Sequence, residues 1–235
     1  MAKKEELNVH IGHRKREKER YLKEGLESFH DHEVLELLLF FAIPYKDTNS
    51  LAHELLQKYG SLSGVLEADY HDLLRMRGIG ENAATLLSLL PAVCRRYQID
   101  KYGSRVLLNT TEELGTYVMD LFIGYNYEVF YLICLDTQNR VINAARIHEG
   151  TINEVAVYPR IVVETAIRNK AKSVVMAHNH PGGSLRPTAS DLEMTGKIFD
   201  VLRDISIPVL DHIIVSGGKY FSFSEKGLLP FGNNK

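Results

Sequence analysis

The chain has 235 residues, 45% of them hydrophobic, which suits one large folded domain or two small ones. Its formal net charge of −2 excludes a protein that coats nucleic acid through overall positive charge. Two cysteines without a Cys-x-x-Cys pattern, a polar N-terminus and the lack of any apolar run of about 20 residues predict a cytoplasmic protein without disulfides, signal peptide or membrane span.

A basic arm and a helical segment make up the first part of the chain. Residues 1–28 form the arm, in which Lys and Arg are interleaved with Glu. Between residues 31 and 97, apolar residues recur every three or four positions, which is typical of amphipathic helices. One such series is Val34, Leu37, Leu38 and Phe41. We therefore expect a helical domain over residues 29–97.

Two nearby glycines, Gly78 and Gly80, indicate a helix-hairpin-helix element in this domain, because glycine permits the sharp turn between two helices. The backbone N–H groups at the start of the following helix would form an anion site for a DNA phosphate. Arg75, Arg77 and the basic arm could add contacts, whereas Glu81 places a negative charge beside the turn. We expect weak, non-specific, salt-sensitive DNA binding through Gly78, Gly80, Arg75 and Arg77, or else a hairpin that only packs against protein.

The pattern changes after residues 98–109, which we expect to be a linker. Runs rich in β-forming residues then alternate with helical ones, which predicts an α/β or α+β sheet domain over residues 110–235. Strands are expected near residues 129–135, 141–147, 173–177 and 213–215, and helices near residues 111–122, 159–169 and 190–205.

The most informative motif follows the expected strand at residues 173–177. His178 and His180 lie two residues apart, so on an extended strand both imidazoles share one face at its end. A loop rich in Gly and Pro then turns the chain, and Asp191 can return as a third ligand. Two histidines and one carboxylate leave a tetrahedral zinc one open position, as in catalytic sites. We therefore predict a Zn²⁺ site at His178, His180 and Asp191, with His212 in the core or beside a ligand.

The spacing of these ligands, H-x-H-x10-D, resembles that of the JAMM/MPN metalloproteases. The chain resembles more specifically the bacterial RadC-type (UPF0758) family, because of the H-N-H-P-x-G sequence that begins at His178 and of residues 210–214 and 220–223. This resemblance extends over essentially the whole chain. It implies an α+β protein in which an N-terminal helix-hairpin-helix domain precedes a JAMM/MPN-type, cytidine-deaminase-like α/β sandwich. It also implies a zinc-dependent peptidase or isopeptidase that acts on a peptide or protein conjugate.

Amide hydrolysis also needs a general base that takes a proton from the zinc-bound water and delivers it to the leaving amine. The upstream candidates are Glu128, Glu149, Glu154 and Glu164. JAMM proteins have their catalytic Glu at the start of the strand after the first helix. By this resemblance Glu128 is the base, and Glu149 and Glu154 are the alternatives.

The resemblance also implies an oxyanion-stabilising Ser three residues before the metal-binding Asp, and this chain has Thr188 there. A Thr hydroxyl can donate the same hydrogen bond, and Ser184 and Ser190 are the alternative donors. Thr188 and Asp191 also match a helix capping box, with Thr188 as the N-cap residue. Both roles are compatible, since a carboxylate at a helix start can also face a metal.

One competing interpretation is a non-enzymatic, nucleic-acid-associated protein, linked to DNA repair by the label of the family, whose hairpin binds DNA and whose metal site is structural or vestigial. A zinc deaminase is excluded because the chain lacks both H-x-E and P-C-x-x-C patterns. The order of the ligands argues against a non-haem iron oxygenase. The sequence predicts neither the substrate nor the oligomeric state.

Overall fold

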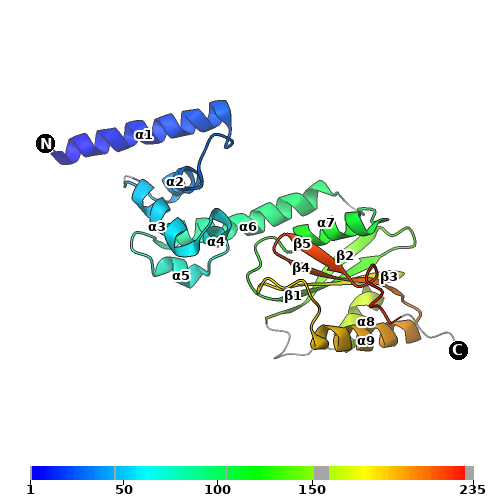
Figure 1. The fold of residues 1–235 in the computed structure, drawn as a ribbon. Coiled ribbons are helices and arrows are strands. Elements are labelled where there is room, and N and C mark those ends of the chain that lie inside the picture. The colour runs from blue at the N-terminus through cyan, green and yellow to red at the C-terminus, as the bar shows by residue number, and fades with distance from the viewer. Residues whose placement is uncertain (1, 45, 104, 151–158, 231–235) are drawn as a thin grey trace. The chain divides into compact units, whose positions relative to one another are not determined.

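The computed structural model describes residues 2–44, 46–103, 105–150 and 159–230, and for residues 2–11 only the backbone (Figure 1). It divides the chain into two compact units, Met1–Val93 and Cys94–Lys235. The first unit is helical and the second contains a five-stranded sheet with helices, which confirms the predicted α+β class. No helix in the described ranges combines the length and the apolar character that crossing a bilayer requires.

The first unit is built from helices and has one apolar core. The helices are α1 (Ala2–Glu24), α2 (Asp31–Ala42), α3 (Asn49–Tyr59), α4 (Leu62–Leu66), α5 (Tyr70–Leu74) and the first part of α6 (Glu81–Lys101). Leu35, Leu39, Leu55, Leu73 and Leu87 are fully buried in this core. These leucines come from α2, α3, α5 and α6, so the helices are held together by burial of apolar surface.

The segment expected to be a basic arm is largely helical, as α1, and packs against α2. The Arg14 guanidinium donates hydrogen bonds to the carbonyl oxygens of Phe40 at 3.2 Å and Ile43 at 2.8 Å, where α2 ends. Arg20 donates to the Glu33 carboxylate at 2.8 Å. These two arginines are thus occupied within the unit, which weakens the idea that they contact DNA.

Helix α6 extends further than the sequence indicated. Residues 98–101, expected to begin the linker, form its last turn, and Pro91 lies inside it. The division between the two compact units falls within this helix, after Val93.

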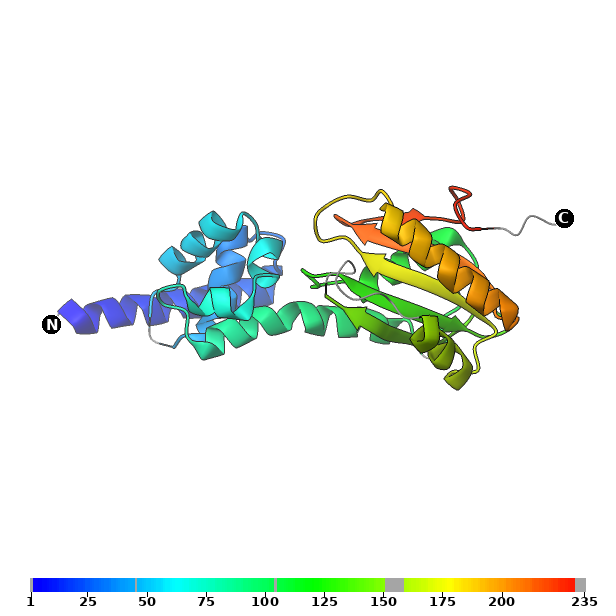
Figure 2. The ribbon, with the colours of Figure 1, turned by 90° about the horizontal axis from the view of Figure 1, so that it is seen from below.

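The second unit is a three-layer sandwich with the sheet in the middle. The strands are β1 (Val129–Leu135), β2 (Val141–Glu149), β3 (Ser173–Asn179), β4 (Val209–Ser216) and β5 (Lys219–Ser222), in the order β2-β1-β3-β4-β5. Among the strand pairs of the described residues, β3–β4 is parallel and the others are antiparallel. One face of the sheet carries α7 (Thr111–Leu121), and the other carries α8 (Pro159–Arg168) and α9 (Ala189–Asp204), which lie in front of the sheet in Figure 2.

Side chains of β1 belong to two apolar cores, one on each face of the sheet. All residues of β1 are buried, and successive side chains point to opposite faces of the sheet. Phe130, Leu132 and Cys134 pack with α8 and α9, whereas Tyr131 and Ile133 pack with α7. Because β1 and β3 are antiparallel and Phe130 pairs with His178, β1 begins beside the end of β3, where the histidine motif lies.

Candidate metal centre

Three side chains with metal-binding atoms converge at the end of β3. His178 and His180 come from the end of this strand and the residue just after it, and Asp191 comes from the first turn of α9. His178 Nε2 lies 3.0 Å from His180 Nε2 and 3.2 Å from Asp191 Oδ1, and His180 Nε2 lies 3.4 Å from Asp191 Oδ2. The structure therefore brings together the three residues that the sequence motif singled out.

The donor set and its spacing fit a divalent cation. His180 Nδ1 donates a hydrogen bond to the Ser184 carbonyl oxygen at 2.8 Å, which leaves the Nε2 lone pair of His180 facing the other two ligands. Ligand atoms around a tetrahedral zinc with bonds of about 2.0–2.2 Å are roughly 3.3–3.6 Å apart. The distances among His178, His180 and Asp191 are close to this range, so the residues could hold a metal ion.

The electrostatics favour the protonation states that a metal requires at His178 and Asp191, whereas the hydrogen bond with Asp191 raises the pKa of His180. Burial lowers the pKa of His178, which is 0% exposed, and lowers the pKa of the fully buried His212 further still. Burial opposes ionisation of Asp191, but its interactions with His178 and His180 nevertheless hold the pKa of this carboxyl well below its usual value. Asp191 is therefore a carboxylate and His178 a neutral imidazole at neutral pH, as metal ligation demands.

The predicted capping box at the start of α9 is present. Thr188 Oγ1 accepts a hydrogen bond from the Asp191 backbone N–H at 3.1 Å, and the Thr188 backbone N–H donates to Asp191 Oδ2 at 2.7 Å. The Thr188 hydroxyl also donates to Asp191 Oδ2 at 2.8 Å. The cap thus fixes the carboxylate of the third ligand and uses the proton that an oxyanion would need.

Glu128 lies one residue before β1 and is half-buried. Its negative charge contributes to raising the pKa of His180, after a larger effect from the hydrogen bond with Asp191, and it acts in the same direction on the pKa of His178, where burial dominates. The Glu128 carboxylate is therefore near enough to both histidines to influence them, as a base for this site must be.

Asn179, between the two histidines, holds the backbone on both sides of Glu128. Its Oδ1 accepts a hydrogen bond from the Val129 backbone N–H at 2.7 Å, and its Nδ2 donates to the Tyr127 carbonyl oxygen at 2.9 Å. The metal-binding motif did not predict this role of Asn179. The signal that could have drawn attention to it is a polar side chain at the end of a largely apolar strand.

The alternative residues have less favourable positions. Glu149, the last residue of β2, is paired with Arg146 at 2.8 Å, and Glu164 is paired with Arg160 on α8. Glu154 lies outside the described residues. The two alternative oxyanion donors, Ser184 and Ser190, are exposed, as Thr188 is, but Thr188 is the one whose hydroxyl donates to the Asp191 carboxylate.

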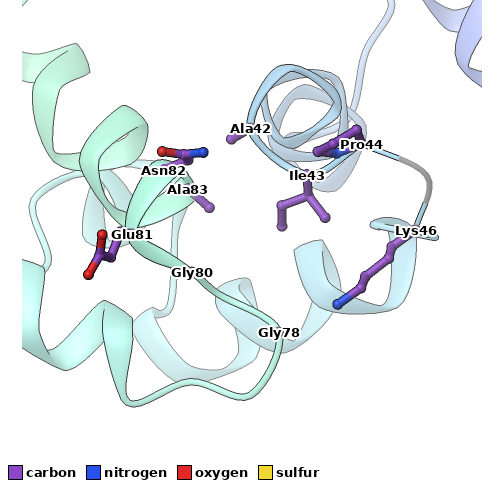
Figure 3. A pocket seen from close by; sticks show the side chains of 9 residues that line it. All are labelled: Ala42, Ile43, Pro44, Lys46, Gly78, Gly80, Glu81, Asn82 and Ala83. Carbon is purple, nitrogen blue, oxygen red and sulfur yellow. The ribbon is translucent and has the colours of Figure 1, made fainter.

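The glycine hairpin of the first unit lines a pocket of about 400 Å³ (Figure 3). Gly78 has a φ of +97°, so the turn uses the left-handed conformation that glycine allows. Lys46 and Glu81 both line the pocket, and their side chains lie on opposite sides of the view in Figure 3. Arg75 and Arg77 are exposed but do not line the pocket, and Arg75 forms an ion pair with Asp72.

Comparison with known proteins identifies the family. A model of the RadC-like JAB domain matches residues 108–228, and a model of the UPF0758 N-terminal region matches residues 10–85. The chain belongs to the RadC (UPF0758) family. A UPF0758 protein from Fusobacterium nucleatum is 36% identical over 226 residues, which are 93% of this chain and 97% of the relative. Another, from Paraburkholderia phytofirmans, is 37% identical over 210 residues, covering 89% of this chain and 81% of the relative.

The two RadC-family matches correspond to the two regions described above. The JAB match contains the whole sheet and the cluster of His178, His180 and Asp191, and the N-terminal match contains the glycine hairpin and the helical core except Leu87. The RadC-family membership predicted from the sequence is thereby confirmed.

Proposed function

We propose that this protein is a zinc-dependent peptidase or isopeptidase. The observation that carries the proposal is the convergence of His178, His180 and Asp191 at the end of β3, beside a glutamate at the start of β1. Two neutral imidazoles and one carboxylate leave room for a water molecule on a zinc ion, whereas structural zinc sites use four protein ligands.

In the proposed chemistry, His178, His180 and Asp191 would hold the ion, and Glu128 and Thr188 would act on the substrate and the water. When bound, zinc lowers the pKa of its water to about 7 and polarises the scissile carbonyl. Glu128 takes the proton from the attacking water and delivers it to the leaving amine. Thr188 is the proposed oxyanion donor, and in that role its hydroxyl turns from Asp191 Oδ2 to the substrate oxygen. The proposed substrate is a peptide or protein conjugate in the cytoplasm.

Metal removal tests this function. The probes are quenched-fluorescent peptides and peptides joined through a lysine ε-amine. We expect cleavage by the zinc-loaded protein, loss of cleavage after chelation, and recovery with one equivalent of zinc per chain but not with magnesium. Cleavage that persists after complete chelation, or zinc-loaded protein that cleaves none of these amides, would argue against a hydrolase.

DNA binding through the hairpin is a second candidate function. The pocket beside Gly78 and Gly80 favours it, because Lys46 and the first residues of α6 line this pocket together. α6 is a long helix, and the N–H groups of its first turn attract anions.

Gly80→Glu tests the hairpin by adding a negative charge. A Cβ at Gly80 would meet no atom within 4 Å, so the side chain fits without strain. We expect binding of a fluorescent DNA duplex at low salt to weaken about three- to tenfold, while zinc content is unchanged. Gly80→Gln, of similar size but neutral, is the control. Equal binding by both variants, or wild-type binding that does not weaken with added salt, would exclude the hairpin as a phosphate site.

A further inference from the structure

A chain of buried hydrogen bonds extends from the ligand His178 away from the metal position. His178 Nδ1 lies 2.8 Å from Nε2 of His212, and His212 Nδ1 lies 2.7 Å from the Thr195 hydroxyl. The Thr195 hydroxyl donates at 2.5 Å to the backbone carbonyl of Asp191, another ligand. His178 and His212 are 0% exposed and Thr195 is 1% exposed, so water does not compete for these bonds.

The direction of every bond in this chain follows from counting protons. A carbonyl oxygen can only accept, so the single proton of the Thr195 hydroxyl is used on Asp191. Thr195 Oγ1 must therefore accept from His212 Nδ1–H. A neutral imidazole carries one N–H, which leaves His212 Nε2 as an acceptor for His178 Nδ1–H. The remaining nitrogen, His178 Nε2, then presents its lone pair to His180 and Asp191.

We propose that Thr195 and His212 are positioning residues, which lock His178 in its Nδ1–H tautomer and thereby set the zinc affinity of the site. The inference deepens the proposed function, since it rests on zinc as the occupant. Partners of this kind on the second ring nitrogen of a metal-binding histidine fix its tautomer and orientation, and their loss typically costs about 10–100-fold in metal affinity.

Thr195 and His212 are directly connected with two of the ligands, His178 and Asp191. Thr195 lies one turn after Asp191 on α9, so its side chain can reach back to the carbonyl of that ligand. His212 lies on β4, the strand that pairs with β3, which carries His178. The hydrogen bonds thus join α9, β4 and β3, and the two ligands His178 and Asp191 are connected both at the metal position and behind it.

Thr195→Val is the decisive variant, because it keeps the shape of the side chain but removes the hydroxyl. Thr195→Ser is its matched control, which retains the hydroxyl. Zinc affinity is measured by competition with a chelator. The tautomers of His178 and His212 are read from ¹H–¹⁵N spectra of the metal-free protein.

We expect the wild type and Thr195→Ser to show Nδ1–H on both rings and similar zinc affinity. Thr195→Val should lose the single tautomer of His212 and bind zinc about 10–100-fold more weakly. Zinc affinity of Thr195→Val within threefold of the wild type would overturn the proposal. A wild-type spectrum with the proton on His178 Nε2 would overturn it as well, even if the valine variant fails to fold.

Failure of this inference differs from failure of the proposed function. If the wild-type protein binds zinc but cleaves no amide, the hydrolase function is ruled out, but the zinc affinities of the wild type and Thr195→Val can still be compared. Wild-type protein that binds no zinc overturns both.

Discussion

Glu128→Gln is expected to lower kcat for amide cleavage by about 10²–10⁴-fold while one zinc stays bound per chain. Glutamine has nearly the shape of glutamate but cannot take a proton at neutral pH. Glu128 is not one of the three clustered residues, so we expect zinc binding not to depend on it. The measurement is kcat on any amide substrate that the wild type cleaves, together with elemental analysis of the same preparation.

Glu149→Gln is the control for this prediction. Glu149 is the last residue of β2 and lies opposite Val129, the residue after Glu128. Its carboxylate, however, forms an ion pair with Arg146. We expect this variant to keep wild-type turnover. If Glu128→Gln retains full activity and Glu149→Gln loses it, the base has been assigned to the wrong carboxylate.

His178→Ala and Asp191→Asn are each expected to lose the bound zinc, from one ion per chain to nearly none. His178→Ala leaves one imidazole and one carboxylate, too few for a stable tetrahedral site. Asp191→Asn keeps the shape of the third ligand and an oxygen that can still accept the bonds of the α9 cap, but removes its charge. Zinc content after dialysis is measured by elemental analysis.

His71→Ala provides the comparison for these variants, because His71 is exposed on α5 in the other compact unit. It should bind as much zinc as the wild type. Circular dichroism shows whether each variant is folded, so that loss of zinc is separated from loss of structure. Folded Asp191→Asn with a full complement of zinc would mean that the ion is held elsewhere.

The sequence predicted those features of the site that depend on local pattern. The period-two alternation of a strand places His178 and His180 on one face, and the capping box places Asp191 in the first turn of α9. The first five residues of β3, 173–177, were predicted for the same reason, because a short apolar run bounded by turn residues is a strong local signal.

The features that the sequence could not predict depend on pairing between distant segments. No role was predicted for Thr195, because it acts through its hydrogen bond with His212. His212 lies next to His178 only when β4 pairs with β3. The contact of Asn179 with residues 127 and 129 depends on the register of β1 against β3. No local periodicity encodes such a register, which is set by the packing of the whole sheet.

The hydrogen bond between Asn179 and the Val129 amide makes the geometry of the candidate metal centre observable without a substrate. This amide proton is held by a side chain that lies between two metal ligands, and it belongs to the residue after the proposed base. Its exchange with solvent requires β1 and β3 to separate at their shared end or the Asn179 side chain to turn away. The deuteration rate of this single position therefore reports how often base and ligands lose their alignment, in any variant and at any metal loading.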